Sequence, residues 1–191
     1  MAFLHKGINK ANIFERLDFR KFQEEYPYSS KRPCVFISHH KSDTNECRYI
    51  AQYIKDSGID VYFDEYDKTL SELVAQGDSQ GVTKRIQEGI DMSTNMLCVI
   101  SRQTRNSYWV PFEIGYAYSK TDLTTLTLKG INDNELPDYL KIKRILRGTK
   151  TLNEYIATLN GKKVTEILNE NLVKSHTSMT HYLDNVLDWN S

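Results

Sequence analysis

The segment PCVFISHHKSDTNEC, residues 33–47, decides the fold of this chain. Directly after Pro33 stands the apolar run CVFI at 34–37, which is typical of a strand buried on both faces of a sheet. The pattern Asp43-x-x-Glu46 then resembles a capping box and predicts the start of a helix. A buried strand that leads at once into a helix favours an α/β architecture.

Strand-like and helix-like patterns continue to alternate further along the chain. Gly58 is expected to end the first helix, and the polar stretch 64–81 is expected to form a long loop. Such alternation predicts a parallel sheet covered on both faces by right-handed crossovers. Because the strands are short and the chain is small, a flavodoxin-like doubly wound sheet fits better than a barrel. The expected elements are strands at 59–63, 96–100, 123–128 and 142–146, and helices around 82–90 and 109–118.

Both ends of the chain are expected to add helices to this sheet. Residues 12–26 suggest an amphipathic helix, which belongs to an N-terminal helical extension over 1–32. The sheet domain is expected over 33–159, and a C-terminal helical extension over 160–191. The terminal helices either pack on the domain or serve self-association. The C-terminal helix is expected from the apolar stripe Met179, Tyr182, Leu183, Val186 and Leu187.

The composition excludes several classes of protein. Lys+Arg and Asp+Glu both number 25, so the formal net charge is zero, whereas proteins that coat nucleic acids are usually basic. The basic cluster at 141–147 is better explained as a solvated sheet edge. The longest apolar run, 96–100, is far too short to span a membrane, and the N-terminus lacks the apolar stretch of a secretory signal. We expect a cytoplasmic protein with neither nucleic-acid nor membrane partners.

The cysteines and histidines do not predict a metal site. Cys34, Cys47 and Cys98 are widely spaced and form no CxxC pair, and two of them lie in apolar strand-like runs. We expect buried, inert thiols. The histidines lack a zinc-binding spacing as well.

Ligand-binding residues are expected at the carboxyl ends of the strands, where doubly wound sheets bind their ligands. The first such loop contains Ser38, His39, His40 and Lys41, whose polar groups could hold phosphates or ribose hydroxyls near a helix start. An ordinary polar loop explains these residues equally well. The chain has no glycine-rich phosphate-binding motif and no hydrolase motif, which argues against dehydrogenase or kinase chemistry.

A second candidate lies in the segment WVPFE, residues 109–113. Trp109 and Glu113 are four positions apart, so the indole and the carboxylate can face one cavity from the same side of a helix. The alternative is a surface glutamate that complements the helix dipole. The residues alone leave both interpretations open.

Five blocks of the sequence, in order and spacing, resemble the successive blocks of a TIR domain over about residues 33–159. Each block alone is weak, but five in the same order are specific. The blocks are VFISHH at 35–40, GIDVYFD at 58–64, IQEGI at 86–90, CVIS at 98–101 and WVPFEI at 109–114.

This resemblance implies a flavodoxin-like fold and, in many members of the family, an enzyme that cleaves NAD+ between nicotinamide and ribose. The catalytic glutamate of the family's W-x-x-x-E arrangement falls on Glu113, with Trp109 as its aromatic partner. NAD+ is the substrate, and no further cofactor and no metal are implied. The implied substrate-binding residues are Trp109, Ser38, His39, His40, Lys41 and Asp64. The stretch 64–81 is longer than is usual in the family, which leaves the assembly geometry open.

One carboxylate is enough for this chemistry. Ordinary glycosidases need a second carboxyl group to protonate a poor leaving group, whereas nicotinamide leaves NAD+ as a neutral molecule. The remaining task is to hold the ribose and to stabilise the positive charge that develops on it. Water as the acceptor gives ADP-ribose, and an acceptor within the same molecule gives a cyclic product.

The resemblance extends to short bacterial TIR proteins of antiphage defence, which implies a cyclic ADP-ribose-like signal for a sirtuin-domain effector. Self-association through TIR surfaces or terminal helices is implied as well. The alternative is a non-enzymatic adaptor that acts by TIR–TIR assembly. A polar first loop and Glu113 favour the enzyme, because an adaptor needs neither.

Overall fold

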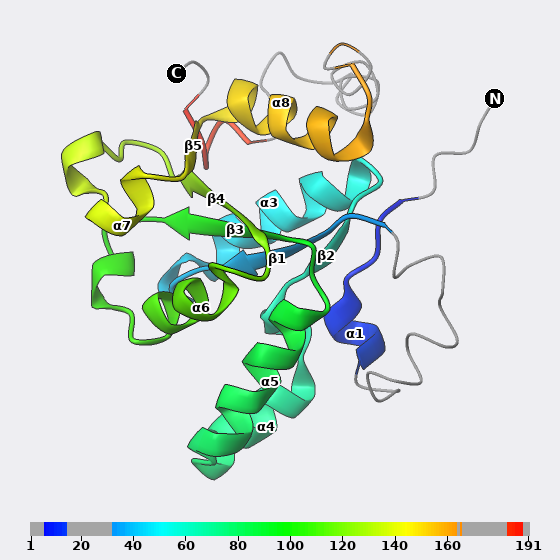
Figure 1. Cartoon of the computed structure of the whole chain (residues 1–191), viewed down its shortest axis with the longest axis vertical. Coiled ribbons are helices and arrows are strands. Elements are labelled where there is room, and N and C mark those ends of the chain that lie inside the picture. Colours follow the sequence, from blue (N-terminus) through cyan, green and yellow to red (C-terminus); the bar gives the residue numbers. More distant parts are fainter. Residues whose placement is uncertain (1–5, 15–31, 164, 166–182, 189–191) are drawn as a thin grey trace.

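A five-stranded parallel sheet forms the centre of the molecule in the computed structural model, which describes residues 6–14, 32–163, 165 and 183–188 (Figure 1). The strand order is β2-β1-β3-β4-β5, so the chain winds outward from β1 in both directions. The predicted flavodoxin-like α/β fold is therefore confirmed. The strands are β1 (Cys34–Ser38), β2 (Asp60–Tyr62), β3 (Asn95–Ile100), β4 (Asp122–Thr127) and β5 (Arg144–Arg147).

Helices cover both faces of this sheet, as Figure 1 shows, with α3 and α8 on one side and α5 and α6 on the other. Helix α3 ends at Asp56, Ser57 is its C-cap residue, and Gly58 follows with a φ of 88°, as the sequence predicts. The α-helices are α1 (Lys10–Phe14), α3 (Thr44–Asp56), α4 (Lys68–Gln76), α5 (Ser79–Asp91), α6 (Trp109–Ala117), α7 (Asp138–Lys141) and α8 (Thr149–Asn160).

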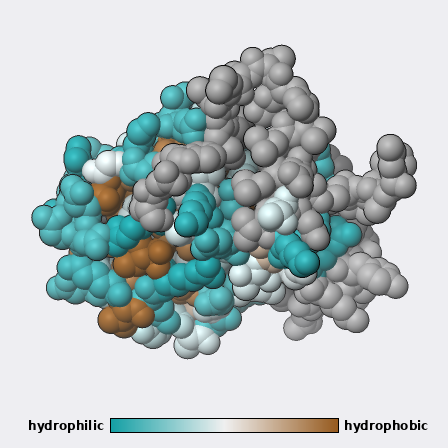
Figure 2. All heavy atoms as spheres, turned by 90° about the horizontal axis from the view of Figure 1, so that it is seen from above, coloured by the Kyte–Doolittle hydropathy of each residue, from teal (hydrophilic) through white to brown (hydrophobic). Residues whose placement is uncertain are grey.

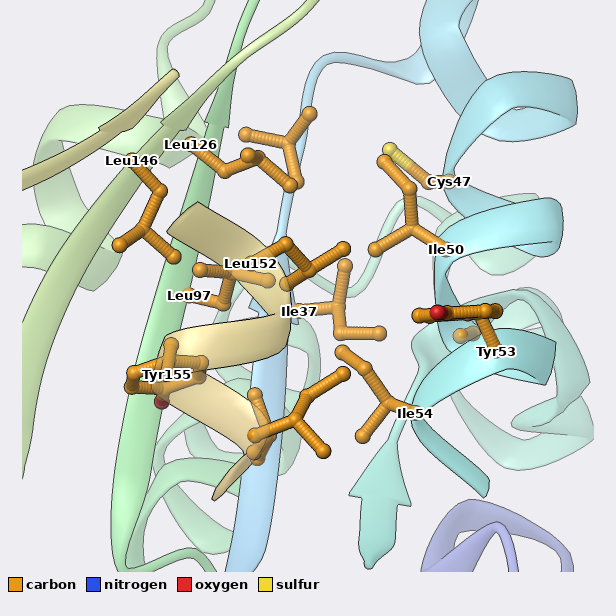
Figure 3. Close-up of a cluster of buried hydrophobic side chains, with 14 of the residues drawn as sticks. Ile37, Cys47, Ile50, Tyr53, Ile54, Leu97, Leu126, Leu146, Leu152 and Tyr155 are labelled. Carbon is orange, nitrogen blue, oxygen red and sulfur yellow. The ribbon is translucent and has the colours of Figure 1, made fainter. Parts of the chain in front are cut away.

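The strands are apolar on both faces because each face has its own core. Alternate side chains of a strand point to opposite faces, so Val35 and Ile37 belong to one cluster and Cys34 and Phe36 to the other. Figure 3 shows the first cluster, in which Ile37, Leu97 and Leu126 of the sheet meet side chains of α3 and α8. The second cluster, beneath α5 and α6, is the one that borders the candidate site.

The stretch 64–81 is not the long loop that the sequence suggested, because half of it is helix α4 and shorter helical pieces lie at its two ends. Asp67 caps this helix by accepting a hydrogen bond from the backbone N–H of Leu70 at 3.0 Å. Gly77 ends it with a φ of 71°, a left-handed conformation that glycine adopts without strain. Asp78 then caps α5, and the α4–α5 pair projects from the body of the molecule (Figure 1).

A buried polar network fixes the base of the α4–α5 pair to the sheet. The Asp67 carboxylate is fully buried and accepts hydrogen bonds from Tyr62 Oη at 2.5 Å and from Arg85 Nε at 2.7 Å. Tyr62 lies on β2 and Arg85 on α5, so the network joins a strand to both helices. The network therefore makes residues 64–81 an ordered part of the fold.

The N-terminal segment runs along β2 at the edge of the sheet. The Asn9 side chain accepts from the backbone N–H of Phe63 and donates to its carbonyl oxygen, both at 3.1 Å, as a neighbouring strand would. A Cβ on Gly7 would lie 1.8 Å from the Ile59 carbonyl oxygen, so only glycine fits at this position. Helix α1 begins at Lys10, and the predicted helix beyond residue 14 lies outside the described residues.

The described part of the C-terminal segment packs into the core. Leu183, Val186 and Leu187 are all buried in the cluster of α3 and α8, and the Val186 carbonyl accepts from Lys129 N at 3.0 Å. Residues 183–186 form turns rather than the predicted helix, and Met179 and Tyr182 lie outside the described residues. These three apolar side chains are thus not exposed for contact with a second copy of the chain.

The described surface carries only scattered apolar residues. Viewed from above in Figure 2, it is mainly hydrophilic, with small separate apolar patches. The most exposed large apolar side chains, Tyr108, Ile142 and Val74, belong to different parts of the chain. Within the described ranges, no helix has the length and apolar character that crossing a membrane requires.

Candidate active site

The alternation of β1 places Ser38 on the face of the sheet that α6 covers. Cys34, Phe36 and Ser38 share this face, and Ser38 is the last residue of the strand. It is 1% exposed and pairs in register with Cys98 of the neighbouring strand β3. A buried hydroxyl therefore lies at the carboxyl end of β1, next to the central strand β3.

Glu113 meets this hydroxyl from the inner face of α6. Its neighbours on that face are Val110, Ile114 and Ala117, which are all buried. Glu113 itself is only 5% exposed, and Ser38 Oγ donates a hydrogen bond to Glu113 Oε2 at 2.5 Å. This burial excludes the interpretation of Glu113 as a surface glutamate that merely complements the helix dipole.

The surroundings of Glu113 favour its neutral form in the absence of a cation. Burial raises the pKa of the carboxyl to about 8, against the opposing effect of the hydrogen bond from Ser38. The Asp64 carboxylate raises it further. Burial and the nearby Glu113 also raise the pKa of the Cys98 thiol well above its ordinary value, so Cys98 stays protonated. A positively charged ligand would reverse this balance at Glu113 and favour the carboxylate.

His39 and Asp64 form a second pair at the same edge of the sheet. His39 Nδ1 lies 3.9 Å from Asp64 Oδ1, and His39 Nε2 lies 3.2 Å from Thr44 Oγ1. The imidazole packs on the Phe63 ring, with 5.1 Å between the centroids. Asp64 begins a short 3-10 helix after β2, and its pKa is raised by burial and lowered by His39. The structure thus brings together Ser38, His39, Asp64 and Glu113.

His40 and Lys41 lie on the exposed side of the first loop. His40 Nδ1 accepts from the backbone N–H of Ser42 at 3.2 Å and caps the 3-10 helix Lys41–Asp43. Lys41 is exposed. Their roles in substrate binding stay predictions.

Trp109 begins α6 and carries an exposed aromatic surface. Its side chain is 40% exposed, and its ring meets the edge of Phe112 with centroids 5.9 Å apart. Phe112 in turn stacks on Tyr116, which extends the aromatic row along the helix. That the indole and the Glu113 carboxylate face one cavity stays a prediction.

Sequence reasoning missed the pair Asp43 and Ser101, which join the first loop to the loop after β3. Asp43 was expected to cap α3 through its side chain, but it makes no such cap. Its carboxylate instead accepts from Ser101 Oγ at 2.5 Å. Only the position of each residue after a strand pointed to the site, because the partners are 58 positions apart.

Comparison with protein-family models agrees with this geometry. The model of the TIR domain matches residues 35–158, about two thirds of the chain. The protein belongs to the TIR-domain family. The match begins in β1 and ends in α8, so it contains the whole sheet and the site. Comparison of the TIR protein with curated proteins finds no matching relative. The family includes NAD+ hydrolases, and TIR domains generally self-associate.

Proposed function

We propose that this TIR protein is an enzyme of the NAD+ glycohydrolase or ADP-ribosyl cyclase type. The observation that carries the proposal is the buried Glu113, held by Ser38 at the carboxyl end of β1. NAD+ brings a cationic pyridinium ring to the site, and a buried carboxyl group is a natural partner for that charge. Ribose hydroxyls and phosphates would meet the polar residues His39, His40, Lys41 and Asp64 of the neighbouring loops.

In this reaction Glu113 is the only catalytic group that the protein needs to supply. The bond between the nicotinamide nitrogen and ribose C1′ breaks with its electron pair going to the nitrogen, so nicotinamide leaves neutral. Positive charge then develops on the ribose, where a preorganised carboxylate is worth roughly 3–4 kcal/mol. An oxygen or nitrogen acceptor forms the new bond to C1′ and loses its proton to solvent.

We also infer that this TIR protein resembles ThsB, the sensor of the bacterial Thoeris antiphage system. Its product would be a small cyclic ADP-ribose-like nucleotide that activates a ThsA-like sirtuin-domain effector. Burial of Ser38 and Glu113 supports cyclisation, because a site that excludes water favours an acceptor held in the same molecule. Cytoplasmic action is supported by three free cysteines, as is usual in a reducing compartment.

The test is chromatography of nucleotides from cells that express the chain, with and without phage challenge. Glu113→Gln keeps the size and hydrogen bonding of the side chain but removes its charge, so the nucleotide signal should be lost while the fold is kept. Glu72→Gln, on the exposed face of α4, is the matched control and should signal normally.

Filtered small molecules from challenged cells are then applied to a purified nucleotide-responsive effector. Activation by the wild-type filtrate alone supports the cyclic product. If only linear ADP-ribose is found and the filtrate does not activate the effector, the protein is a hydrolase rather than a cyclase. Full signalling by a folded Glu113→Gln protein would contradict the enzyme proposal and favour the alternative, a non-enzymatic adaptor that acts by TIR–TIR assembly.

A further inference from the structure

A partly buried hydrogen bond joins the loop that follows Ser38 to the loop that follows β3. Ser101 Oγ donates to Asp43 Oδ2 at 2.5 Å, and Asp43 is only 7% exposed. Asp43 belongs to the loop after β1 and Ser101 directly follows β3, and these two strands are neighbours in the sheet. A hydrogen bond to an ionised acceptor in a sheltered place is stronger than one between neutral groups.

From Ser101, a continuous series of hydrogen bonds leads to the start of α6. The Ser101 N–H donates to Thr104 Oγ1 at 2.9 Å, and the Thr104 carbonyl accepts from Ser107 N at 3.1 Å. Ser107 Oγ then accepts from the N–H of Val110, in the first turn of the helix, at 3.1 Å. The position of Ser101 therefore determines where α6 begins and where it carries Glu113.

From Asp43, a similar series leads back to the first loop. The Asp43 N–H donates to the His40 carbonyl at 2.8 Å, and Ser42 Oγ donates to Asp43 Oδ1 at 3.2 Å. The hydroxyl of the next residue, Thr44, lies 3.2 Å from His39 Nε2. Asp43 is therefore hydrogen-bonded to two residues of the loop that follows Ser38, His40 and Ser42.

We propose that Asp43 and Ser101 are positioning residues, whose hydrogen bond holds the loop after Ser38 against the helix that carries Glu113. Neither residue needs to touch the substrate. The bond keeps the site closed around the Ser38–Glu113 pair before any ligand arrives, which is the preorganisation that a charge-stabilising site requires. The catalytic consequence rests on the proposed function, whereas the positioning itself does not.

The test is the pKa of Glu113, measured by carboxyl ¹³C NMR on the full chain, with Glu113→Gln to identify the signal. Burial is the main reason that this pKa is raised, so opening the two loops should admit water and lower it. We expect a fall of about half a pH unit or more in Ser101→Ala and in Asp43→Ala. The double variant should fall no further than either single variant, because both remove the same bond.

Two further variants separate positioning from general loss of stability. Ser101→Thr keeps the hydroxyl and should retain the wild-type pKa. Tyr53→Phe removes a buried hydrogen bond to Asn153 on the opposite face of the sheet and should leave the Glu113 pKa unchanged. A Glu113 pKa that is unchanged or higher in folded Ser101→Ala, or an equal fall in Tyr53→Phe, overturns the proposal.

Activity provides an independent readout. The nucleotide signal in challenged cells should fall at least about tenfold in Ser101→Ala and recover in Ser101→Thr, since small displacements of a reacting group are costly. If Glu113→Gln signals normally, the proposed function fails while the NMR test still stands. If Ser101→Ala lowers the pKa but signals fully, positioning for catalysis is overturned and the enzyme proposal remains.

Discussion

Glu113 couples the chemistry of the site to the stability of the fold, because its carboxyl group is buried with Ser38 as its hydrogen-bond donor. Its raised pKa favours the protonated form of the carboxyl at neutral pH before a ligand binds. A cationic substrate would draw the ionised form into place, so binding and ionisation of Glu113 support each other.

The stability of the protein should therefore depend on pH through Glu113. The folded pKa of about 8 lies above that of an unfolded glutamate, so the folded state binds the proton more tightly. This contribution is complete at low pH and is lost as pH rises through about 8. Relative to wild type, Glu113→Gln should gain stability between pH 5 and about pH 9, on the order of a few kcal/mol.

Urea unfolding at several pH values measures this difference, with Glu72→Gln as the control. If the difference between Glu113→Gln and wild type does not change with pH, then Glu113 does not titrate as a buried group.

Ser38 should set the pH at which the carboxylate forms. Its hydrogen bond lowers the Glu113 pKa against the effect of burial, so Ser38→Ala should raise that pKa. The pH–rate profile of the active enzyme should then shift to higher pH. Ser79→Ala, at the exposed start of α5, should leave the profile in place. A profile that falls in height without moving along the pH axis would contradict this role for Ser38.

At the scale of elements, the α4–α5 pair depends on one buried carboxylate. Asp67 caps α4, receives Tyr62 from β2 and pairs with Arg85 of α5, so three elements meet at one side chain. A buried charge left without its partner is far more costly than an exposed ion pair.

Arg85→Met should destabilise the fold by about 3–5 kcal/mol, because it leaves the Asp67 charge buried with neutral donors alone. Adding Asp67→Asn should recover part of the loss, since the uncompensated charge disappears. Arg48→Met removes an exposed pair with Glu65 and should cost about 1 kcal/mol or less. Denaturant unfolding compares the three proteins. Equal losses from Arg85→Met and Arg48→Met would show that the buried network is not what fixes α4 and α5.

At the scale of the whole molecule, the basic residues along the β5 edge lie in local pairs with acidic or aromatic partners. In the basic cluster at 141–147, Lys141 pairs with Asp138, Arg147 with Asp133, and the Lys143 ammonium lies 3.9 Å from the centre of the Tyr118 ring. The cluster lies at the β5 edge of the sheet. These partners explain the cluster without a nucleic acid.

The purified protein alone should turn over NAD+ slowly at neutral pH. A constitutive NAD+-consuming enzyme would harm its host, so catalysis by the proposed enzyme should need a trigger. Chromatography of NAD+ incubated with micromolar protein at pH 7 measures the rate, and Glu113→Gln gives the background. Rapid loss of NAD+ in simple buffer would contradict the expectation and would mean that no trigger is needed.

The sequence by itself determined the fold, and it made Glu113 a candidate without deciding whether the side chain is buried. Apolar runs such as 34–37 can be satisfied only by burial on both faces, and Gly58 could be recognised as a helix end because its backbone conformation is local. Helix α4 was missed because its polar composition resembles a loop, although Asp67 and Gly77 marked its two ends.

Only the tertiary structure decided what these residues do together. A helix-start glutamate can lie at the surface or in the core, and the packing of α6 on β1 is what buries Glu113 against Ser38. In the same way, Asp43 could have capped its own helix, but its carboxylate instead accepts a hydrogen bond from Ser101 of the adjacent loop. Local patterns fix the conformation of a segment, whereas burial and pKa depend on neighbours that are distant in the chain.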